Sequence, residues 1–272
     1  MSLMHCTGTP RVPRYTRAMR FVVLLVGWFA SGGLGQALAP EPFARHRFTS
    51  RDGSVLPYRL LAPAHTIAGR RYPLVVQLHG SGAIGTDNDA QIGAFSNGWL
   101  QPDIRERFPA FVLVPQFPAR TVEYPSGRSP LRSQPTSLLS AAYELIDTVV
   151  SDVPIDRSRV YIVGFSMGAS SALQAIVTRR SLFAAAMAIA PVPPDTTIAP
   201  STPLLILHGD RDTENPFTVS RAWFNEQRPR KGAAMEMKVY PGLEHQIPPD
   251  VPTGSWWREW LFSKRLRPSH LR

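Results

Sequence analysis

The chain has 272 residues, of which 43% are hydrophobic, and a formal net charge of +10. These values fit one globular domain with a sizeable core and exclude a disordered or collagen-like chain. Four positive charges fall in the first 39 residues and four in the last nine, so only two of the ten remain for the body of the chain. Because a solvated, frayed end commonly carries such charge, the basic balance does not indicate nucleic-acid binding.

The first 39 residues have the three parts of a secretory signal peptide. Four arginines without an acidic residue are followed by an apolar run over residues 21–30 and by small residues that end at Ala39. The run is much shorter than the roughly 20 residues of a membrane-spanning helix, so we expect cleavage and export to the periplasm or the medium rather than an anchor. Because Pro40 would directly follow a cut after Ala39, a cut after Ala37 is an alternative, and Met19 is an alternative start.

The only cysteine of the chain, Cys6, precedes the apolar run. It is therefore not a lipid-attachment cysteine at the cleavage site. The mature chain is expected to contain no cysteine, which suits an oxidising compartment without disulfides and excludes a thiol nucleophile.

Apolar runs predict the strands of a central sheet. The pattern over residues 48–61 is strand-like and is broken by Asp52-Gly53, a hairpin turn signal. Nearly continuous apolar runs are typical of strands that are buried on both faces of a parallel sheet. Four such runs follow, at residues 74–78, 111–114, 160–163 and 204–207.

Helical patterns lie between these strands. Apolar residues recur at three- and four-residue spacing from 138 to 149, after a cap at Thr136 or Ser137, and a second helix is expected directly after Ser166. Alternating strands and helices predict a doubly wound α/β domain. The proline-rich residues 116–135 have no clear period and are interpreted as a loop over one end of the sheet, at the site.

Residues 164–168, GFSMG, place Ser166 between two glycines. Small-residue packing alone can produce this pattern, but here a strand runs into it and a helix leaves it. A serine on a sharp strand-to-helix turn is held in strained geometry with its hydroxyl projecting from the sheet. Ser166 is therefore predicted to be a nucleophile, and the N–H groups of the helix that begins at Met167 lie where an oxyanion would form.

A serine nucleophile needs a base, which is normally an imidazole oriented by a carboxylate. Of the seven histidines, two lie near the chain ends and two in early irregular segments. His79 and His208 each end a strand before a glycine, which suits a structural role. His245, in a loop before the last helix, remains as the predicted base.

The loop after residues 204–207 is expected to supply the acid. Asp210 and Asp212 are both candidates, either could instead cap the next helix, and spacing does not choose between them. A second oxyanion donor is expected in the glycine-rich loop at residues 78–85. That loop does not match a phosphate-binding pattern and no Cys/His cluster indicates a metal site, so no cofactor is expected.

Several stretches together resemble the α/β-hydrolase superfamily, in particular the group of esterases and predicted peptidases related to polyhydroxybutyrate depolymerases, feruloyl esterases and phospholipase/carboxylesterases. The resemblance implies an α/β-hydrolase fold over residues 40–272, with a mostly parallel sheet, helices on both faces and an N-terminal antiparallel hairpin. The matching stretches, in the order of that group, are YPLVVQLHGSGAIGTDN, VLVPQFP, IDRSRVYIVGFSMGAS, FAAAMAIAP, PLLILHGDRDTENP, YPGLEH and WLFSKR.

Carried over position by position, the resemblance implies Ser166 as nucleophile, Asp212 as acid and His245 as base. It also implies that the backbone N–H groups of Ser81 and Met167 are the oxyanion donors. Three departures from the pattern of the group leave the substrate open: Ala169 in place of a second glycine, Tyr124 as the nearest candidate for a tryptophan, and the run Gln246-Ile247-Pro248 after the histidine.

These observations predict an exported serine esterase that cleaves a small-molecule or polymer ester through an acyl-enzyme. A serine peptidase would use the same residues and is the alternative. A non-catalytic binding module on the same fold is a further alternative, which predicts that one of the three residues is missing. Neither a nucleic acid nor a stable membrane anchor is expected as a partner.

Overall fold

The computed structural model describes residues 42–127, 129–196 and 200–266. The predicted signal peptide over residues 1–39, with Cys6, lies outside the described residues. Within the described ranges, no helix combines the length and the apolar character that crossing a bilayer requires.

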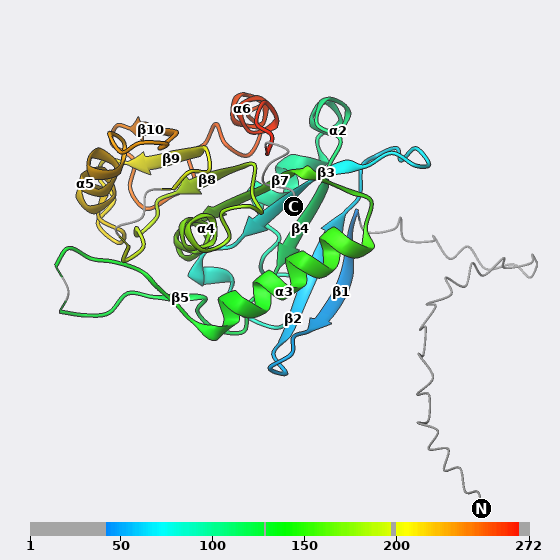
Figure 1. The fold of residues 1–272 in the computed structure, drawn as a ribbon, viewed down its shortest axis with the longest axis horizontal. Helices are drawn as coiled ribbons and strands as arrows, with labels where there is room; N and C mark the ends of the chain where they lie inside the picture. Colours follow the sequence, from blue (N-terminus) through cyan, green and yellow to red (C-terminus); the bar gives the residue numbers. More distant parts are fainter. Residues whose placement is uncertain (1–41, 128, 197–199, 267–272) are drawn as a thin grey trace, which may run out of the picture. The chain divides into compact units, whose positions relative to one another are not determined.

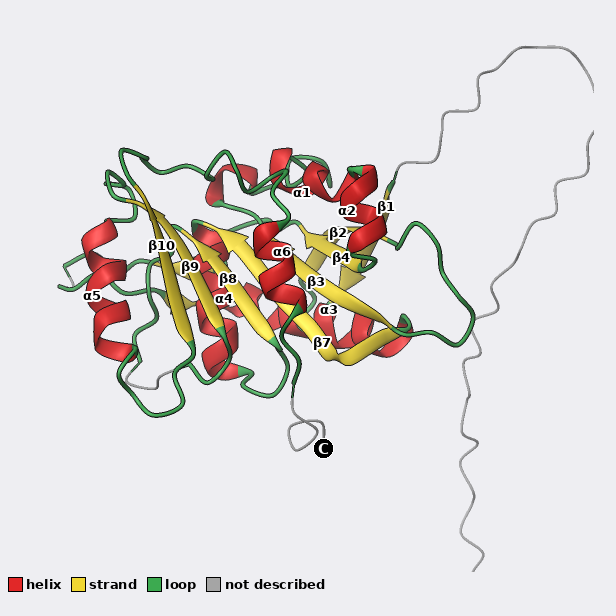
Figure 2. Ribbon diagram, turned by 90° about the horizontal axis from the view of Figure 1, so that it is seen from above, coloured by secondary structure: helices red, strands yellow, loops and turns green. Residues whose placement is uncertain are grey.

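An eight-stranded sheet forms the centre of the domain, with the strand order β1-β2-β4-β3-β7-β8-β9-β10 (Figures 1 and 2). Strand β2 is antiparallel to both of its neighbours, whereas every pair from β4 to β10 is parallel. The strands are β1 (Phe43–Thr49), β2 (Val55–Leu61), β3 (Tyr72–Leu78), β4 (Phe111–Pro115), β7 (Ile155–Phe165), β8 (Ala185–Ile189), β9 (Leu204–Gly209) and β10 (Met235–Tyr240).

The predicted strands are all present. Residues 48–61 belong to the β1–β2 hairpin, whose turn contains Gly53 at φ 85°. The four apolar runs form β3, β4, β7 and β9. Strands β8 and β10 were not predicted, because β8 is mostly alanine and β10 has partly exposed residues instead of a buried apolar run. The proline-rich segment contains a short antiparallel pair, β5 (Val122–Glu123) and β6 (Gln134–Pro135).

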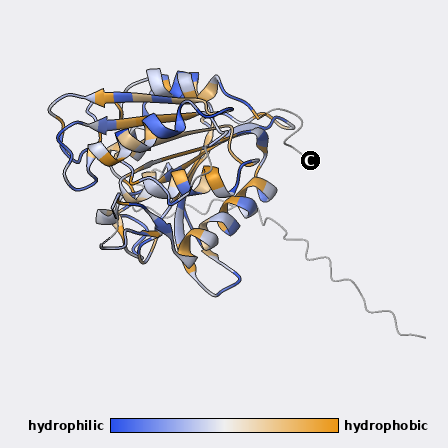
Figure 3. Ribbon diagram, turned by 60° about the vertical axis from the view of Figure 1, so that its left-hand side comes forward, coloured by the Kyte–Doolittle hydropathy of each residue, from blue (hydrophilic) through white to orange (hydrophobic). Residues whose placement is uncertain are grey.

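Helices cover both faces of the sheet because successive residues of a strand point to opposite faces. In β3, Leu74 and Val76 pack in the core that includes residues of α3, α4 and α5, whereas Val75 packs with α2 and α6. Figure 3 shows hydrophobic residues along the strands. The helices are α1 (Ala94–Asn97), α2 (Pro102–Arg107), α3 (Ser137–Asp152), α4 (Met167–Thr178), α5 (Phe217–Gln227) and α6 (Trp256–Phe262), with 3-10 turns η1 (Ser81–Ala83) and η2 (Gly98–Leu100). This architecture confirms the predicted α/β-hydrolase fold.

The candidate residues follow the carboxyl ends of parallel strands, which meet at one edge of the sheet. Ser81 follows β3, Ser166 follows β7, Asp212 follows β9 and His245 follows β10. In open α/β sheets this edge is where ligands bind. The topology therefore gathers residues that are far apart in the sequence.

Candidate active site

Ser166 occupies the tight turn between β7 and α4. Its backbone has φ 55° and ψ −116°, and a positive φ is uncommon outside glycine, so the turn is strained. The Ser166 N–H donates to the carbonyl of Ile189 at 2.9 Å. A Cβ on Gly164 would lie 2.4 Å from the carbonyl carbon of Gly168, and one on Gly168 would lie 2.3 Å from the carbonyl oxygen of Leu78. Close backbone approach therefore requires both glycines of the pentapeptide.

Ser166, His245 and Asp212 are joined by a chain of hydrogen bonds. His245 Nε2 lies 2.8 Å from Ser166 Oγ, and His245 Nδ1 lies 2.7 Å from Asp212 Oδ2. Because an ionised carboxylate only accepts hydrogen bonds, Nδ1 carries the proton and Nε2 faces the hydroxyl as an acceptor. The Asp212 side chain is fully buried, whereas Ser166 and the His245 side chain remain 8% and 10% exposed.

The two acidic candidates have different partners. Asp210 is exposed and accepts the backbone N–H of Gly242 at 2.7 Å. Asp212 uses its Oδ1 atom to accept the N–H of Asn215 at 2.9 Å, which leaves Oδ2 directed at His245. Neither side chain caps α5. Of the two, Asp212 is the one that contacts the histidine.

Asp212 has a second histidine partner that the sequence reasoning missed. His208 Nε2 lies 3.1 Å from Asp212 Oδ2 and 2.9 Å from the carbonyl oxygen of Asn215. Its ring is fully buried and packs edge-on against Phe217. Burial lowers the pKa of His208 below its ordinary value. The signal in the sequence is the four-residue spacing between His208 and Asp212.

The loop after β3 lies against the serine. A Cβ on Gly80 would lie 3.4 Å from Ser166 Cβ. Ser81 begins η1 and Met167 begins α4, and the first N–H groups of a helix have no acceptor within it. Within the described ranges, neither N–H has a backbone acceptor elsewhere. Both are therefore available to a ligand oxygen.

His79 fixes the start of this loop. Its Nε2 atom accepts the backbone N–H of Phe117 at 3.1 Å, and its Nδ1 atom donates to the carbonyl of Gly80 at 2.7 Å. Burial lowers the pKa of His79 below its ordinary value, so a neutral ring with the proton on Nδ1 fits both contacts. The structural role predicted for His79 agrees with these contacts.

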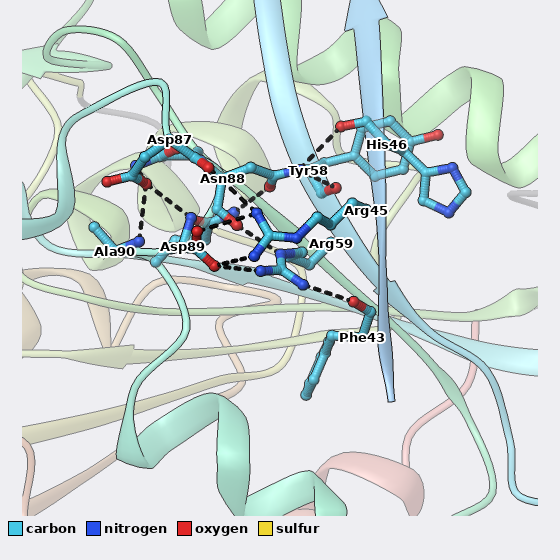
Figure 4. A network of polar contacts seen from close by, with 11 residues as sticks. Phe43, Arg45, His46, Tyr58, Arg59, Asp87, Asn88, Asp89 and Ala90 are labelled. Carbon is cyan, nitrogen blue, oxygen red and sulfur yellow. Dashed lines mark hydrogen bonds and ion pairs between the residues drawn. The ribbon is translucent and has the colours of Figure 1, made fainter. Parts of the chain in front are cut away.

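A polar network holds the far end of the loop to the β1–β2 hairpin (Figure 4). Asn88 has φ 63°, donates its N–H to Gln116 at 2.6 Å, and donates its side-chain amide to two carbonyl groups of the hairpin at 3.2 Å. Arg59, which is buried, donates to the Asn88 carbonyl and pairs with Asp89, and Arg45 pairs with the same carboxylate. The loop is thus fixed at both ends.

The proline-rich segment packs beside the serine. The Tyr124 hydroxyl lies 2.9 Å from Ser170 Oγ, and Thr121 Oγ1 lies 2.7 Å from Ser171 Oγ, both on α4. Burial raises the pKa of Tyr124, so its hydroxyl stays protonated near neutral pH. These contacts place the segment near the site, as the sequence predicted.

His245 lies between an aromatic ring and an acidic side chain. The ring centroids of Phe165 and His245 are 5.0 Å apart. On the Nε2 side, the largely exposed carboxylate of Glu214 lies 3.9 Å away. Among the described residues, no group of three or more His, Cys, Asp or Glu side chains could hold a metal ion.

A family model described as phospholipase/carboxylesterase matches residues 135–251, a range that includes Ser166, Asp212 and His245. No curated protein matches the sequence. The crystal structure of a thermostable esterase is 30% identical with a TM-score of 0.70, and the match covers 82% of this chain and 63% of that chain. The chain therefore spans less than two thirds of that esterase.

Two further solved structures share the fold at lower identity. A ferulic acid esterase from Anaeromyces mucronatus, in complex with ferulic acid, is 17% identical with a TM-score of 0.57, over 79% of this chain and 88% of that chain. Acyl-protein thioesterase 2 from Zea mays is 18% identical with a TM-score of 0.55, over 76% of this chain and 97% of that chain. The chain has the α/β-hydrolase fold, and its sequence over residues 135–251 is similar to the phospholipase/carboxylesterase family.

Proposed function

We propose that the protein hydrolyses carboxylic esters with Ser166 as nucleophile, His245 as base and Asp212 as the acid that orients the base. The observation that supports this most directly is the unbroken hydrogen-bond chain from Asp212 Oδ2 through His245 to Ser166 Oγ. The similarity to a thermostable esterase supports an ester as substrate.

In the first half of the proposed reaction, Ser166 becomes acylated. His245 Nε2 takes the hydroxyl proton while Ser166 Oγ forms a bond to the ester carbonyl carbon, and the carbonyl oxygen becomes an oxyanion. The N–H groups of Ser81 and Met167 donate to this oxyanion, and Asp212 stabilises the charged His245. The bond to the alcohol oxygen then breaks, and the leaving alkoxide takes the proton from His245.

In the second half, water releases the acid. His245 Nε2 takes a proton from a water molecule as the water oxygen attacks the acyl carbon. A second oxyanion forms on the same N–H groups and collapses by breaking the bond to Ser166 Oγ, which regains its proton from His245. The scheme uses three side chains, two backbone N–H groups and water, and it applies to small-molecule and polymer esters alike.

The test is hydrolysis of p-nitrophenyl acyl esters of increasing chain length by the full chain. Ser166→Ala should lower kcat by several orders of magnitude, as deletions within such triads do. Ser171→Ala is a matched control, because this buried α4 hydroxyl bonds Thr121 and the carbonyl of Met167 rather than His245, and its loss should leave kcat nearly unchanged. Equal activity of wild type and Ser166→Ala would reject Ser166 as nucleophile.

Two further outcomes separate the alternatives. Cleavage of p-nitroanilides with no cleavage of any ester would favour the peptidase. A folded wild type that cleaves neither substrate, and whose Ser166 is not labelled by a fluorophosphonate, would favour the non-catalytic binding module. Labelling of Ser166 followed by mass spectrometry therefore accompanies the kinetic assay.

We also propose that the protein is exported after cleavage near residue 39. The support is the sequence pattern of a basic start, a short apolar run and small residues over residues 1–39. N-terminal sequencing of the protein from separated cell fractions tests this. A new N-terminus at residue 38 or 40 outside the cytoplasm is expected, and an uncleaved chain in the cytoplasm would reject the proposal.

A further inference from the structure

His208 lies directly behind the acid of the proposed triad. Its ring is fully buried, and its Nε2 atom contacts Asp212 Oδ2 at 3.1 Å and the Asn215 carbonyl oxygen at 2.9 Å. A carboxylate and a carbonyl oxygen can only accept hydrogen bonds. Nε2 must therefore carry a proton, and His208 acts as a donor to Asp212.

The His208 contact fixes the oxygen that the base uses. Asp212 Oδ2 accepts from both His245 Nδ1 and His208 Nε2, while Oδ1 accepts the N–H of Asn215. Three donors thus hold one fully buried carboxylate in a single orientation. Without His208, Oδ2 would lose the donor opposite the base, and a buried carboxylate that lacks a donor rotates or takes up water to recover one.

The charge state of His208 suits this contact. Burial lowers its pKa, although the neighbouring Asp212 carboxylate acts in the opposite direction, and His245 opposes protonation. The ring packs edge-on against Phe217, and within the described ranges Nδ1 has no hydrogen-bond partner. A neutral donor orients the carboxylate without neutralising it, so the full charge of Asp212 is available to a charged His245.

We propose that His208 is a positioning residue that holds Asp212 Oδ2 in line with His245 during the reaction. This inference rests on the proposed function. It assigns His208 a role in turnover rather than in substrate binding, because the ring is fully buried and contacts the carboxylate of Asp212. Loss of the donor should therefore lower kcat and leave KM nearly unchanged.

The experiment compares His208→Leu with His208→Gln in the full chain, using the p-nitrophenyl ester that wild type hydrolyses fastest. Leucine removes the donor, whereas the glutamine amide restores an N–H near the position of Nε2. Because small misplacements of catalytic groups cost up to about 100-fold, His208→Leu should lower kcat by about 10- to 100-fold with KM within about threefold. His208→Gln should recover most of the loss.

The control is Leu205→Ala, on the same strand but in the core on the opposite face of the sheet. Its kcat per active site, counted by fluorophosphonate labelling, should match wild type although it unfolds more readily. If Leu205→Ala lowers kcat as much as His208→Leu does, the effect is general loosening of β9 and the inference is wrong.

A measurement on wild type covers the case in which the variants do not fold. Nitrogen NMR of the histidine rings, with His208 identified by its contact with the Phe217 ring, should show a neutral ring protonated on Nε2 at pH 7. A charged ring, or a proton on Nδ1, would overturn the inference. An inactive wild type overturns the proposed function and this inference together, whereas active wild type, inactive Ser166→Ala and fully active His208→Leu overturn the inference alone.

Discussion

The tripeptide Leu-His-Gly occurs twice at the carboxyl end of a buried parallel strand, as residues 78–80 at β3 and residues 207–209 at β9. The two histidines make opposite contacts. His79 accepts a backbone N–H at Nε2, whereas His208 donates from Nε2 to a carboxylate and a carbonyl. One local sequence therefore holds two different tautomers.

The neighbours of each strand explain the difference. Strand β3 lies beside β4, and Phe117, two residues after the end of β4, donates its N–H to His79. At β9, the loop that leaves the strand folds back and presents the Asp212 carboxylate to His208. The comparison teaches that the role of a strand-terminal histidine depends on the atoms that surrounding loops present to it.

The glycines of the two tripeptides should give the largest contrast. A Cβ on Gly209 would lie 2.1 Å from the carbonyl oxygen of Leu243, in the loop that carries His245, whereas one on Gly80 would meet the edge of the Phe165 ring at 3.1 Å. A backbone carbonyl can move away from the added methyl group less easily than the side-chain ring of Phe165 can. Gly209→Ala should cost about 3 kcal/mol or more of unfolding free energy, and Gly80→Ala less than about 1.5 kcal/mol.

Urea unfolding of both variants measures this contrast. Ester hydrolysis should fall with Gly209→Ala by about 100-fold, because its clash displaces the loop that carries His245, the proposed base. Equal unfolding free energies for the two alanine variants would show that the β9 end is no more tightly packed than the β3 end.

The histidines themselves should separate stability from activity. His79→Leu leaves the buried N–H of Phe117 without its acceptor, and one such unsatisfied group costs about 1–3 kcal/mol. For His79→Leu, the loss of unfolding free energy should exceed the rise in activation free energy calculated from kcat. For His208→Leu, the rise in activation free energy should be the larger of the two. Denaturant unfolding and kcat per labelled active site, measured on both variants, give the ratio of these two free-energy changes for each variant. If the ratio is similar in the two variants, both residues act only through stability.

The network behind the β3 loop gives a smaller effect. Asn88→Ala removes the side-chain donors to the β1–β2 hairpin and places alanine at φ 63°, where an L-residue costs roughly 1–2 kcal/mol. Asn88→Gly removes the same donors without that strain. The glycine variant should therefore recover part of the lost unfolding free energy. If glycine is no better than alanine, the lost hydrogen bonds account for the whole cost.

The fold was predictable where the residues of a single strand or helix show a clear hydrophobic pattern. The apolar runs of β3, β4, β7 and β9 are buried on both faces and stand out in the sequence. Strand β8, Ala-Ala-Met-Ala-Ile, is equally buried, but its alanines carry little local preference for a strand. Strand formation there depends on the two neighbouring strands, which no short window contains.

The site was predictable to the same extent. Strand, turn and helix around Ser166 are local, so the sequence indicated Ser166 directly as the candidate nucleophile, and elimination selected His245 as the candidate base. The choice between Asp210 and Asp212 and the contact of His208 depend on how loops from β9 and β10 meet. Spacing in the sequence cannot supply that geometry. The catalytic roles of Ser166, Asp212 and His245 stay predictions until kinetics test them.

The smallest expected contrast is in the pH dependence of stability, in which the two histidines should behave alike. Burial lowers the pKa of both His79 and His208, so below pH ~6.5 the unfolded chain binds a proton at each ring that the folded chain does not. Stability is therefore complete above that pH and falls as the pH falls, by at most about 1.4 kcal/mol per pH unit for each ring. His79→Gln and His208→Gln should each flatten the pH dependence of the unfolding free energy between pH 6.5 and 5, whereas Leu205→Ala should lower that free energy without changing the slope. If the slope of unfolding free energy against pH stays unchanged in one glutamine variant, the histidine replaced there already binds a proton in the folded chain. The two histidines would then differ in charge state as well as in tautomer.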